Sequence, residues 1–368
     1  MKVLVLGAGN VGMIVAKMLD TVLPEINLTV ADIGPEWNFK WERRSVPPKY
    51  KQTDFLTFTG PHNLRLLIIE ADIVVSCLPV SVMKAVVPAK QCAELGKHYL
   101  DITEDVGLTD IHRTFDARAK ETGAFIIPQC GLAPGLINII AGDVYRGFDT
   151  CTDLKLSVGA LPTVPANSLG YAFTWSVEGL INEYINPCYA IVNGQSQMIL
   201  PLEGLETIII DGVTLEAFNT SGGLGSLAES LSPINMSYKT MRYPGHCALM
   251  KFLLNDLKLR ENPDLAKEIL TNAIPNTEKD LVFMRVVGTG QRNGRLVQDT
   301  WTAIAKARPD MTALQLTTGF GVAAIVELIV NGELEKAHGR RGGLVLLENV
   351  VTEKMLAATQ MNKKFAVI

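Results

Sequence analysis

KVLVLGAGNVGMIVAKML, residues 2–19, decides the fold of this chain. The run 2–6 is short and apolar, which is typical of a strand, and 13–19 has the spacing of a helix. Between them stands the pattern G-x-G-x-x-G, and Asp32 follows Gly12 by 20 residues, at the end of a second apolar run. A glycine loop between a strand and a helix, with an acid at this distance, indicates a dinucleotide-binding site.

The three glycines of the loop have separate physical roles. Gly7 permits a tight turn, Gly9 lets backbone N–H groups approach a pyrophosphate, and Gly12 lets the helix pack closely on the strand. The N-terminus of the following helix attracts negative charge. The residues expected to contact the cofactor are Gly7, Gly9, Asn10, Val11, Gly12, Asp32, Ile33, Ser76, Leu78 and Pro79.

Asp32 also predicts which cofactor is used. A carboxylate that accepts hydrogen bonds from the adenosine ribose would repel the extra phosphate of NADP. The next residue, Ile33, cannot hold a phosphate, so NAD is favoured over NADP. The alternative is that Lys40, Arg43 or Arg44 reaches a 2′-phosphate.

Composition bounds the class of protein. The 368 residues carry a net charge of −4 and are 48% hydrophobic, which predicts two domains with substantial cores. No Lys/Arg run suggests a nucleic-acid or membrane surface, and we expect no apolar stretch to reach the roughly 18 residues of a spanning helix. Six cysteines without a CxxC pair and five histidines without ligand spacing predict reduced cytoplasmic thiols and no metal site.

The first 130 residues alternate apolar strands and helices. We expect strands at 71–77, 98–101 and 123–128, and helices at 82–95 and 108–122. Regular alternation predicts an α/β fold with a doubly wound parallel sheet of the Rossmann type. Ligands of such sheets bind outside the carboxyl ends of the strands.

From about residue 150 the pattern changes to local hairpins. Asn193-Gly194 and Asp211-Gly212 each stand between two apolar runs, which is the signature of a two-residue β-turn. This predicts antiparallel pairing and an α+β domain. Residues 312–331 return to helical spacing, with Thr312, Thr317 or Thr318 as N-cap, and we expect this segment to pack on the first domain.

Six stretches give the chain a resemblance to the saccharopine dehydrogenase family, closest to its lysine 6-dehydrogenase branch. They are GAGNVG at 7–12, GKHYLDITED at 96–105, CGLAPGLIN at 130–138, SVEGLINEYINP at 176–187, SGGLGSLAESL at 221–231 and MRYPGH at 241–246. Val80 departs from the pattern, because the reductases of the family carry a tyrosine there.

The resemblance implies both an architecture and an activity. A Rossmann domain at 1–130 would be interrupted by an α+β substrate domain at 131–311 and rejoined by C-terminal helices at 312–368. Members of the family oxidise or reduce a C–N bond of an amino acid or polyamine with NAD or NADP.

Two residues at predicted strand ends match the active-site residues of the family. Oxidation of an amine needs a general base within reach of the nitrogen, because an ammonium cannot release a hydride. Asp101 is the expected base, and its alternative role is a helix cap or a surface acid. Cys130 is expected near a helix that Pro134 begins, where its pKa would be lowered. It would act as a proton relay or as a covalent nucleophile, or else be a buried core residue.

The middle of the chain supplies the expected substrate contacts. Arg242 would hold the carboxylate of an amino acid through two parallel hydrogen bonds, and its alternative is a surface salt bridge. The other expected substrate contacts are Tyr243, His246, Trp175, Gly222 and Gly223, each with a structural alternative.

These residues together predict an NAD-dependent amino-acid dehydrogenase. We expect it to oxidise lysine at its side-chain amine to the 6-semialdehyde, releasing ammonia. The alternatives are saccharopine dehydrogenase or reductase activity, carboxynorspermidine-type chemistry, and, in another class, a non-catalytic NAD-binding regulator. We expect a small-molecule amino-acid substrate as its partner, without nucleic acid or membrane, and a cytoplasmic homodimer.

Overall fold

The computed structural model describes residues 1–33, 54–58, 61–78, 82–165 and 167–350. They fall into two compact units. The first unit joins Met1–Gly131 to the described residues from Thr318 onward, and the second is Leu132–Thr317. Pro79, Lys40, Arg43 and Arg44 lie outside the described residues, as does the segment 351–368 of the predicted C-terminal helices.

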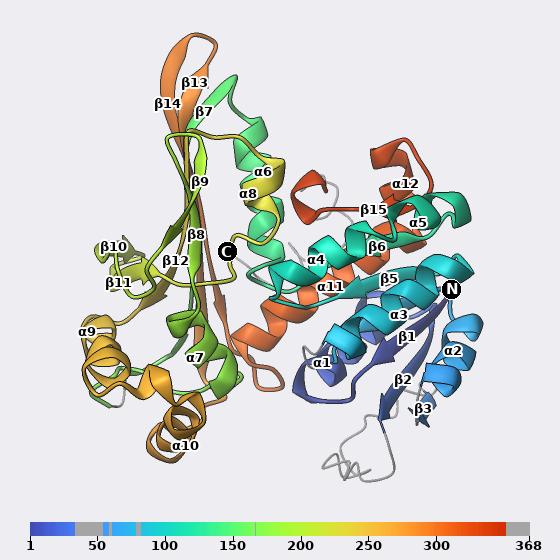
Figure 1. Ribbon diagram of the computed structural model, residues 1–368, viewed down its shortest axis with the longest axis horizontal. Helices are drawn as coiled ribbons and strands as arrows, with labels where there is room; N and C mark the ends of the chain where they lie inside the picture. Colours follow the sequence, from blue (N-terminus) through green and yellow to red (C-terminus); the bar gives the residue numbers. More distant parts are fainter. Residues whose placement is uncertain (34–53, 59–60, 79–81, 166, 351–368) are drawn as a thin grey trace. The chain divides into compact units, whose positions relative to one another are not determined.

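The first unit is built on a seven-stranded parallel sheet with the order β15-β6-β5-β4-β1-β2-β3 (Figure 1). Its strands are β1 Lys2–Leu6, β2 Asn27–Ile33, β3 Asp54–Phe58, β4 Ile73–Ser76, β5 His98–Asp101, β6 Phe125–Ile127 and β15 Gly343–Leu344. The order reverses between β1 and β4, which is the topological switch point of a doubly wound sheet. The predicted Rossmann-type fold is confirmed.

Helices of the first unit follow the predicted alternation. They are α1 Asn10–Val22, α2 Pro61–Glu70, α3 Val82–Leu95, α4 Val106–Arg113, α5 Asp116–Thr122 and α12 Glu333–His338, with most of α11 Ala313–Val330 and the 3₁₀ turn Leu347–Asn349. The prediction of α3 is confirmed at both ends, and Gly96 follows it with a φ of +70°. Left-handed φ values suit glycine, so this residue ends the helix.

One predicted helix is wrong, because 108–122 is two helices. The N–H groups of Thr114 and Phe115 donate to the carbonyls three residues earlier, and the Thr114 hydroxyl donates to Ile111 at 2.6 Å. Such a tightened turn ends α4. A new helix, α5, then begins with the Ala119 N–H donating to the Phe115 carbonyl at 2.8 Å.

The second unit carries an eight-stranded mixed sheet, with the path β10-β11-β12-β7-β13-β14 and the β8–β9 hairpin paired to β12. Its strands are β7 Thr150–Pro162, β8 Cys188–Val192, β9 Gln195–Ile199, β10 Glu206–Ile210, β11 Val213–Asn219, β12 Asn235–Arg242, β13 Asp280–Arg292 and β14 Arg295–Lys306. The turn residues Asn193-Gly194 and Asp211-Gly212 all have positive φ, between +50° and +77°. Both predicted hairpins are confirmed, since these turns need that geometry.

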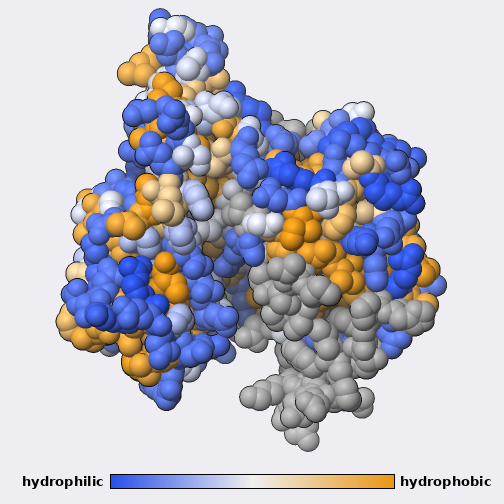
Figure 2. All heavy atoms as spheres, in the orientation of Figure 1, coloured by the Kyte–Doolittle hydropathy of each residue, from blue (hydrophilic) through white to orange (hydrophobic). Residues whose placement is uncertain are grey.

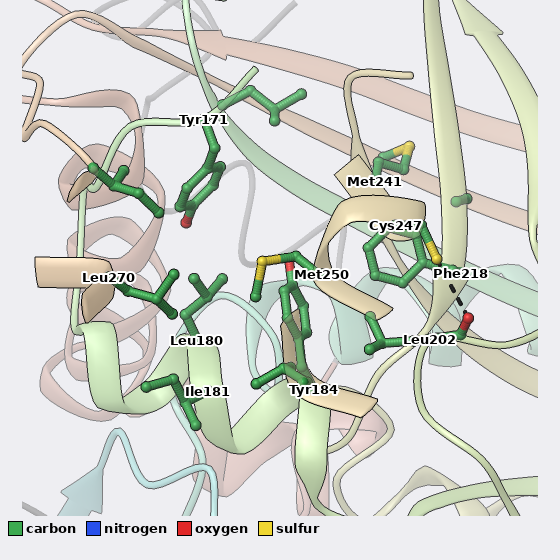
Figure 3. Packing of buried hydrophobic residues seen from close by; sticks show 14 of the residues in the cluster. Tyr171, Leu180, Ile181, Tyr184, Leu202, Phe218, Met241, Cys247, Met250 and Leu270 are labelled. Carbon is green, nitrogen blue, oxygen red and sulfur yellow. Dashed lines mark hydrogen bonds between the residues drawn. The ribbon is translucent and has the colours of Figure 1, made fainter. Parts of the chain in front are cut away.

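Helices pack on this sheet and enclose a core. They are α6 Leu136–Arg146, α7 Val177–Ile185, α8 Leu227–Ser230, α9 His246–Lys251, α10 Pro263–Ala273 and the short turns Phe252–Asp256 and Leu259–Glu261. Figure 3 shows part of the core, where Leu180 and Ile181 of α7 face Met250 and Leu270. The Cys247 thiol donates to the Leu202 carbonyl there, at 3.3 Å. The helix expected to begin at Pro134 begins instead at Leu136.

Helix α11 corrects the expectation that no stretch is long enough to cross a membrane. Its 18 residues have a mean hydropathy of 1.8, which meets the length and composition of a spanning helix. However, 78% of it is buried, as in the core helix of a folded domain. A side chain at Gly319 would lie 3.0 Å from Met18, so α11 packs closely on α1. Most of the face of the protein in Figure 2 is hydrophilic.

Thr312 is the N-cap of α11, as one of the three alternatives predicted. Its hydroxyl accepts from the Gln315 N–H at 3.1 Å, and the Gln315 side chain accepts from the Thr312 N–H at 3.0 Å. This reciprocal pair is a capping box, which satisfies two donors at the helix start. Thr317 instead donates to the Ala313 carbonyl, inside the helix.

Candidate functional site

Three neighbouring parallel strands bring the candidate residues of the first unit to one edge of the sheet. Leu6 pairs in register with Ser76, and Ser76 pairs with Asp101. Leu6 directly precedes the glycine loop, and adjacent strands lie about 4.8 Å apart. Asp101 therefore ends its strand about 10 Å from the start of the glycine loop, at the carboxyl edge where such sheets bind ligands.

The glycine loop has the geometry that a pyrophosphate requires. Gly7 has a φ of +97°, and a side chain at Gly12 would collide with the Gly7 carbonyl. A side chain at Gly9 would meet nothing within 4 Å among the described atoms. No side chain of the described residues caps α1, which begins at Asn10, so its first N–H groups are available to an anion. These residues fit a dinucleotide.

Asp32 ends β2 and belongs to the same loop. Its carboxylate is buried and accepts a hydrogen bond from the Ala8 N–H, while the Gly7 N–H donates to the Ala31 carbonyl at 2.8 Å. The acid therefore holds the loop in place as well as lying where a ribose is expected. Ile33 lies in β2 beside it, and Leu78 follows β4.

Asp101 is almost completely buried, at 2% exposure, and it is neither a surface acid nor the cap of α4. Asp105 caps that helix, accepting from the Gly107 N–H at 2.8 Å. The Oδ1 atom of Asp101 accepts from the N–H groups of Thr103 at 3.1 Å and Gln129 at 2.9 Å. The second bond holds Gln129 at a φ of +64°, a strained conformation for this residue.

The surroundings of Asp101 shift its protonation. Burial raises the pKa of the Asp101 carboxyl, and this outweighs the lowering by His112, the two N–H groups and the Tyr99 hydroxyl. A carboxyl with a raised pKa is easier to protonate near neutral pH, which suits a group that accepts and returns a proton.

Two residues that the sequence reasoning missed complete this cluster. Tyr99 lies two residues before Asp101 on β5, is fully buried, and hydrogen-bonds with Ser76 and Asp101. His112 lies on α4 with its Nδ1 atom 3.7 Å from Asp101 Oδ2. The alternation of β5 placed Tyr99 on the same face as Asp101, a signal that was available in the sequence. His112 arrives through the packing of α4, which no local pattern reveals.

Cys130 corrects one expectation. It lies six residues before α6 begins, so that helix does not lower its pKa; burial, and then the negative charge of Asp101, raise the pKa of the thiol well above its usual value. The thiol donates to the Ile127 carbonyl at 3.3 Å, and the Cys130 N–H donates to the Asp101 carbonyl at 2.6 Å. A buried thiol that stays protonated is a poor nucleophile.

In the second unit, Arg242 and His246 join one buried hydrogen-bonded chain. Arg242 Nε donates to the Tyr184 hydroxyl at 2.9 Å, and that hydroxyl lies 3.0 Å from His246 Nε2. His246 Nδ1 lies 2.9 Å from the Leu169 carbonyl. Arginine only donates and a carbonyl only accepts, so Tyr184 donates to His246, and His246 donates to Leu169 as the neutral Nδ1–H tautomer. Burial, with the charge of Arg242, lowers the pKa of His246 to about 3.

The guanidinium of Arg242 is not part of a surface salt bridge. It is 2% exposed, lies 5.1 Å from the centre of the Tyr171 ring, and has Nη2 3.6 Å from Glu183 Oε2. Its Nη1 donates to its neighbour's carbonyl, that of Met241, at 3.0 Å. The expected carboxylate clamp is thus part of an internal network, and its role in substrate binding stays a prediction.

The remaining expected substrate contacts have structural partners. Trp175 donates to the Tyr171 hydroxyl at 3.1 Å, and Tyr243 donates to the Pro162 carbonyl at 2.9 Å. A side chain at Gly223 would collide with the Tyr238 ring, so this position is glycine because the ring packs on it. Gly222 has a φ of +92°, which a turn requires.

Metal-ligating residues do not gather within the ranges that the structure describes, where no group of three or more His, Cys, Asp or Glu could hold an ion.

The strand order, the glycine loop and the acid at the end of β2 define a Rossmann-type dinucleotide-binding protein. Residues 3–127 match the family model described as saccharopine dehydrogenase NADP binding domain, and residues 131–364 match that of the saccharopine dehydrogenase C-terminal domain. The chain belongs to the saccharopine dehydrogenase family.

Individual relatives agree with this assignment. The chain is 27% identical over 203 residues to the mitochondrial alpha-aminoadipic semialdehyde synthase of Mus musculus, a match that covers 53% of this chain and 21% of the relative. The chain thus spans about a fifth of the length of that relative.

Two solved structures share the fold. Apo saccharopine dehydrogenase (L-Glu forming) of Saccharomyces cerevisiae has a TM-score of 0.76 at 16% identity, covering 99% of this chain and 98% of that one. An engineered D-amino acid dehydrogenase bound to NADP⁺ has a TM-score of 0.50 at 12% identity, covering 96% and 95%.

Proposed function

We propose that this protein is an NAD-dependent amino-acid dehydrogenase that oxidises a C–N bond. Its proposed substrate is lysine, oxidised at the side-chain amine to the 6-semialdehyde with release of ammonia. The observation that carries the proposal is the register Leu6–Ser76–Asp101, because it sets a buried carboxylate beside the glycine loop. A nicotinamide cofactor, when bound, supplies the hydride acceptor for such a reaction.

Asp101 is the proposed general base. A substrate ammonium gives its proton to the carboxylate, so that the neutral amine pushes electron density toward the departing hydride. Water then adds to the resulting iminium carbon. The same carboxyl accepts a proton from this water and donates one to the departing ammonia. The two N–H donors on Oδ1 fix the carboxylate, so little reorganisation is needed during the reaction.

Cys130 is proposed as a neutral hydrogen-bonding group beside this base. Its raised pKa keeps the thiol protonated at neutral pH, and covalent catalysis would need the thiolate. We therefore favour the relay role over the nucleophile role.

Gly7, Gly9 and the N-terminus of α1 would hold the pyrophosphate of the cofactor, and Asp32 would accept from the adenosine ribose. The preference for NAD rests on this carboxylate, although the matched family model is named for NADP. We expect NAD to bind more tightly than NADP, and Asp32→Ala to narrow the difference, as measured by titration of each cofactor. A wild-type preference for NADP of about tenfold, or 1.4 kcal/mol, would overturn this assignment.

Saccharopine dehydrogenase activity is the second candidate, favoured by the family to which both domain models belong. The nitrogen of that substrate already carries a second carbon group, which lysine lacks. Wild-type protein incubated with NAD and lysine alone should form NADH, detected by absorbance. NADH formation with saccharopine but not with lysine would establish the second candidate instead.

A further inference from the structure

His112 is a buried histidine whose hydrogen-bonding capacity is not used by the described residues. It is fully inaccessible to solvent, and neither of its ring nitrogens has a hydrogen-bond partner there. Its Nδ1 atom is 3.7 Å from Asp101 Oδ2, the carboxylate oxygen that the Thr103 and Gln129 N–H groups do not hold. Buried polar groups are rarely left unpaired, so this histidine calls for an explanation beyond packing.

We propose that His112 is a positioning residue whose Nδ1–H faces the Oδ2 atom of Asp101 at 3.7 Å and stabilises the ionised carboxylate through its dipole. The inference rests on the proposed function, in which Asp101 is the base. His112 does not touch the cofactor loop among the contacts described, so it acts through Asp101 alone.

The protonation state of His112 follows from what faces it. Burial lowers the pKa of His112, although Asp101 raises it, so the ring is neutral at neutral pH. A neutral ring carries one hydrogen, on either nitrogen. A lone pair on Nδ1 would face a lone pair on the carboxylate, whereas an Nδ1–H would face an acceptor. The Nδ1–H tautomer is therefore the stable one.

Aromatic neighbours fix the orientation of the ring. The Tyr99 ring meets it edge-on at 5.7 Å between centroids, and the Phe115 ring lies tilted at 6.4 Å.

The titratable groups that face Asp101 are His112 from α4, Tyr99 from β5, Cys77 after β4 and Cys130 after β6. The other three groups are neutral near pH 7, because burial also raises the pKa values of Tyr99, Cys77 and Cys130.

Loss of this contact has a predictable sign. An N–H dipole that faces a carboxylate stabilises the ionised form, so its removal raises the pKa of Asp101. The base is active only when ionised, and activity falls as the pH drops through that pKa. Without the Nδ1–H, the acidic limb of the pH–rate profile moves to higher pH.

The first experiment compares pH profiles of the full-length protein. His112→Phe, which keeps an aromatic ring but has no N–H, should move the acidic limb of kcat upward by roughly half to one pH unit. KM should stay the same. His112→Asn, which retains an N–H donor, should recover part of the shift. Thr109→Val is the matched control, because it removes another buried polar group of α4. An equal shift in Thr109→Val, or none in His112→Phe, would overturn the proposal.

A second experiment needs no turnover. Urea unfolding of wild type, His112→Phe, Asp101→Asn and the double variant gives a double-mutant cycle. At pH 8, where His112 is neutral in both the folded and the unfolded state, we expect His112→Phe to destabilise the protein less in the Asp101→Asn background than in the wild-type background. Equal destabilisation in the two backgrounds would refute the contact. If no substrate is turned over, the proposed function fails while this cycle still decides the role of His112.

Discussion

The Asp101 carboxylate has a structural role as well as being the proposed general base. It ties the end of β5 to the turn after β6 through Thr103 and Gln129, and it does so while buried. An ordinary buried acid is usually neutralised or paired with a cation, and this one is surrounded by neutral donors. Such an arrangement costs folding stability and is typical of a group retained for its chemistry.

Asp101→Asn separates the structural role from the role as a base, because the amide keeps an acceptor oxygen but cannot take a proton. We expect kcat to fall by about 10² to 10⁴, the usual worth of general acid–base catalysis, with NAD affinity unchanged. Steady-state kinetics and cofactor titration measure both.

The fold should survive this change. The pKa of Asp101 is raised in the folded state, so its stability contribution is present at low pH and lost as the pH rises through that pKa. Asp101→Asn should therefore not lower the unfolding free energy at neutral pH. Cys130→Ser is the companion variant, and it should retain measurable activity. A near-wild-type Asp101→Asn beside an inactive Cys130→Ser, with a covalent adduct in the mass spectrum, would reverse the two roles.

Arg242 poses a different question, because its guanidinium already has internal partners. If it also anchors the substrate carboxylate, Arg242→Ala should raise KM by an amount equivalent to about 2–5 kcal/mol. Arg242→Lys should recover only part, since lysine lacks the planar fork. The variants are compared by steady-state kinetics on the proposed amino-acid substrate.

Tyr184→Phe is the control for Arg242, because it removes the hydroxyl that Nε binds and leaves the guanidinium in place. Its KM should stay near that of wild type. Similar KM changes in Tyr184→Phe and Arg242→Ala would assign Arg242 a packing role. An unchanged KM in both Arg242 variants would remove it from the substrate site.

Among the helices and strands, those with local signals were predictable. The hairpin turns at Asn193-Gly194 and Asp211-Gly212 carry their geometry in two residues, and Gly96 ends α3 by itself. The long strands β7 and β12 carry no such punctuation, and they pair in parallel across distant sequence, so they were not predicted. The split between α4 and α5 depends on one threonine hydroxyl, which competes with the helix only in the folded turn.

At the start of α11, the sequence predicts the local cap but not the contact from a distant residue. Thr312 and Gln315 form a local capping box, and the threonine was among the predicted caps. Asp280, 33 residues earlier, also accepts from the N–H groups of Ala313 and Leu314, at 2.5 and 3.1 Å. That contact exists only because β13 begins beside the helix, so no local pattern reveals it.

We expect Asp280→Ala to destabilise the protein more than Thr312→Ala. Asp280 is 1% exposed, and its loss leaves two N–H groups buried without an acceptor, which costs about 2–4 kcal/mol. Loss of a threonine N-cap costs about 1 kcal/mol. Urea unfolding at neutral pH measures both. Asp280→Asn should lie between them, and equal effects of the two alanine variants would show that the aspartate contributes nothing beyond the local cap.

Across the chain as a whole, the site residues with a local sequence signal were predicted, and those placed by contacts between distant residues were not. The glycine loop follows the apolar strand β1, and Asp32 and Asp101 lie at the carboxyl ends of β2 and β5, so strand alternation was enough to place them on one sheet edge. Tyr99 joins the site because it shares a face of β5 with Asp101, whereas His112 arrives through the packing of α4 and Arg242 lies in a buried network with Tyr184. Tertiary contacts therefore decide the partners of each group, while local sequence decides its strand or helix.

The first unit is assembled from both ends of the chain, and cofactor binding should reveal this. NAD at about 100 times its Kd stabilises the folded state by about 2.7 kcal/mol, which slows amide exchange through unfolding about 100-fold. Since residues 318–350 belong to the unit that carries the glycine loop, α11 amides at 318–330 should slow in step with those of β1 and β5. Hydrogen exchange with and without NAD measures this, and β9, the exposed strand of the β8–β9 hairpin, is the internal reference. If β1 and β5 slow while α11 follows the hairpin, the C-terminal helix is not part of the cofactor-binding unit.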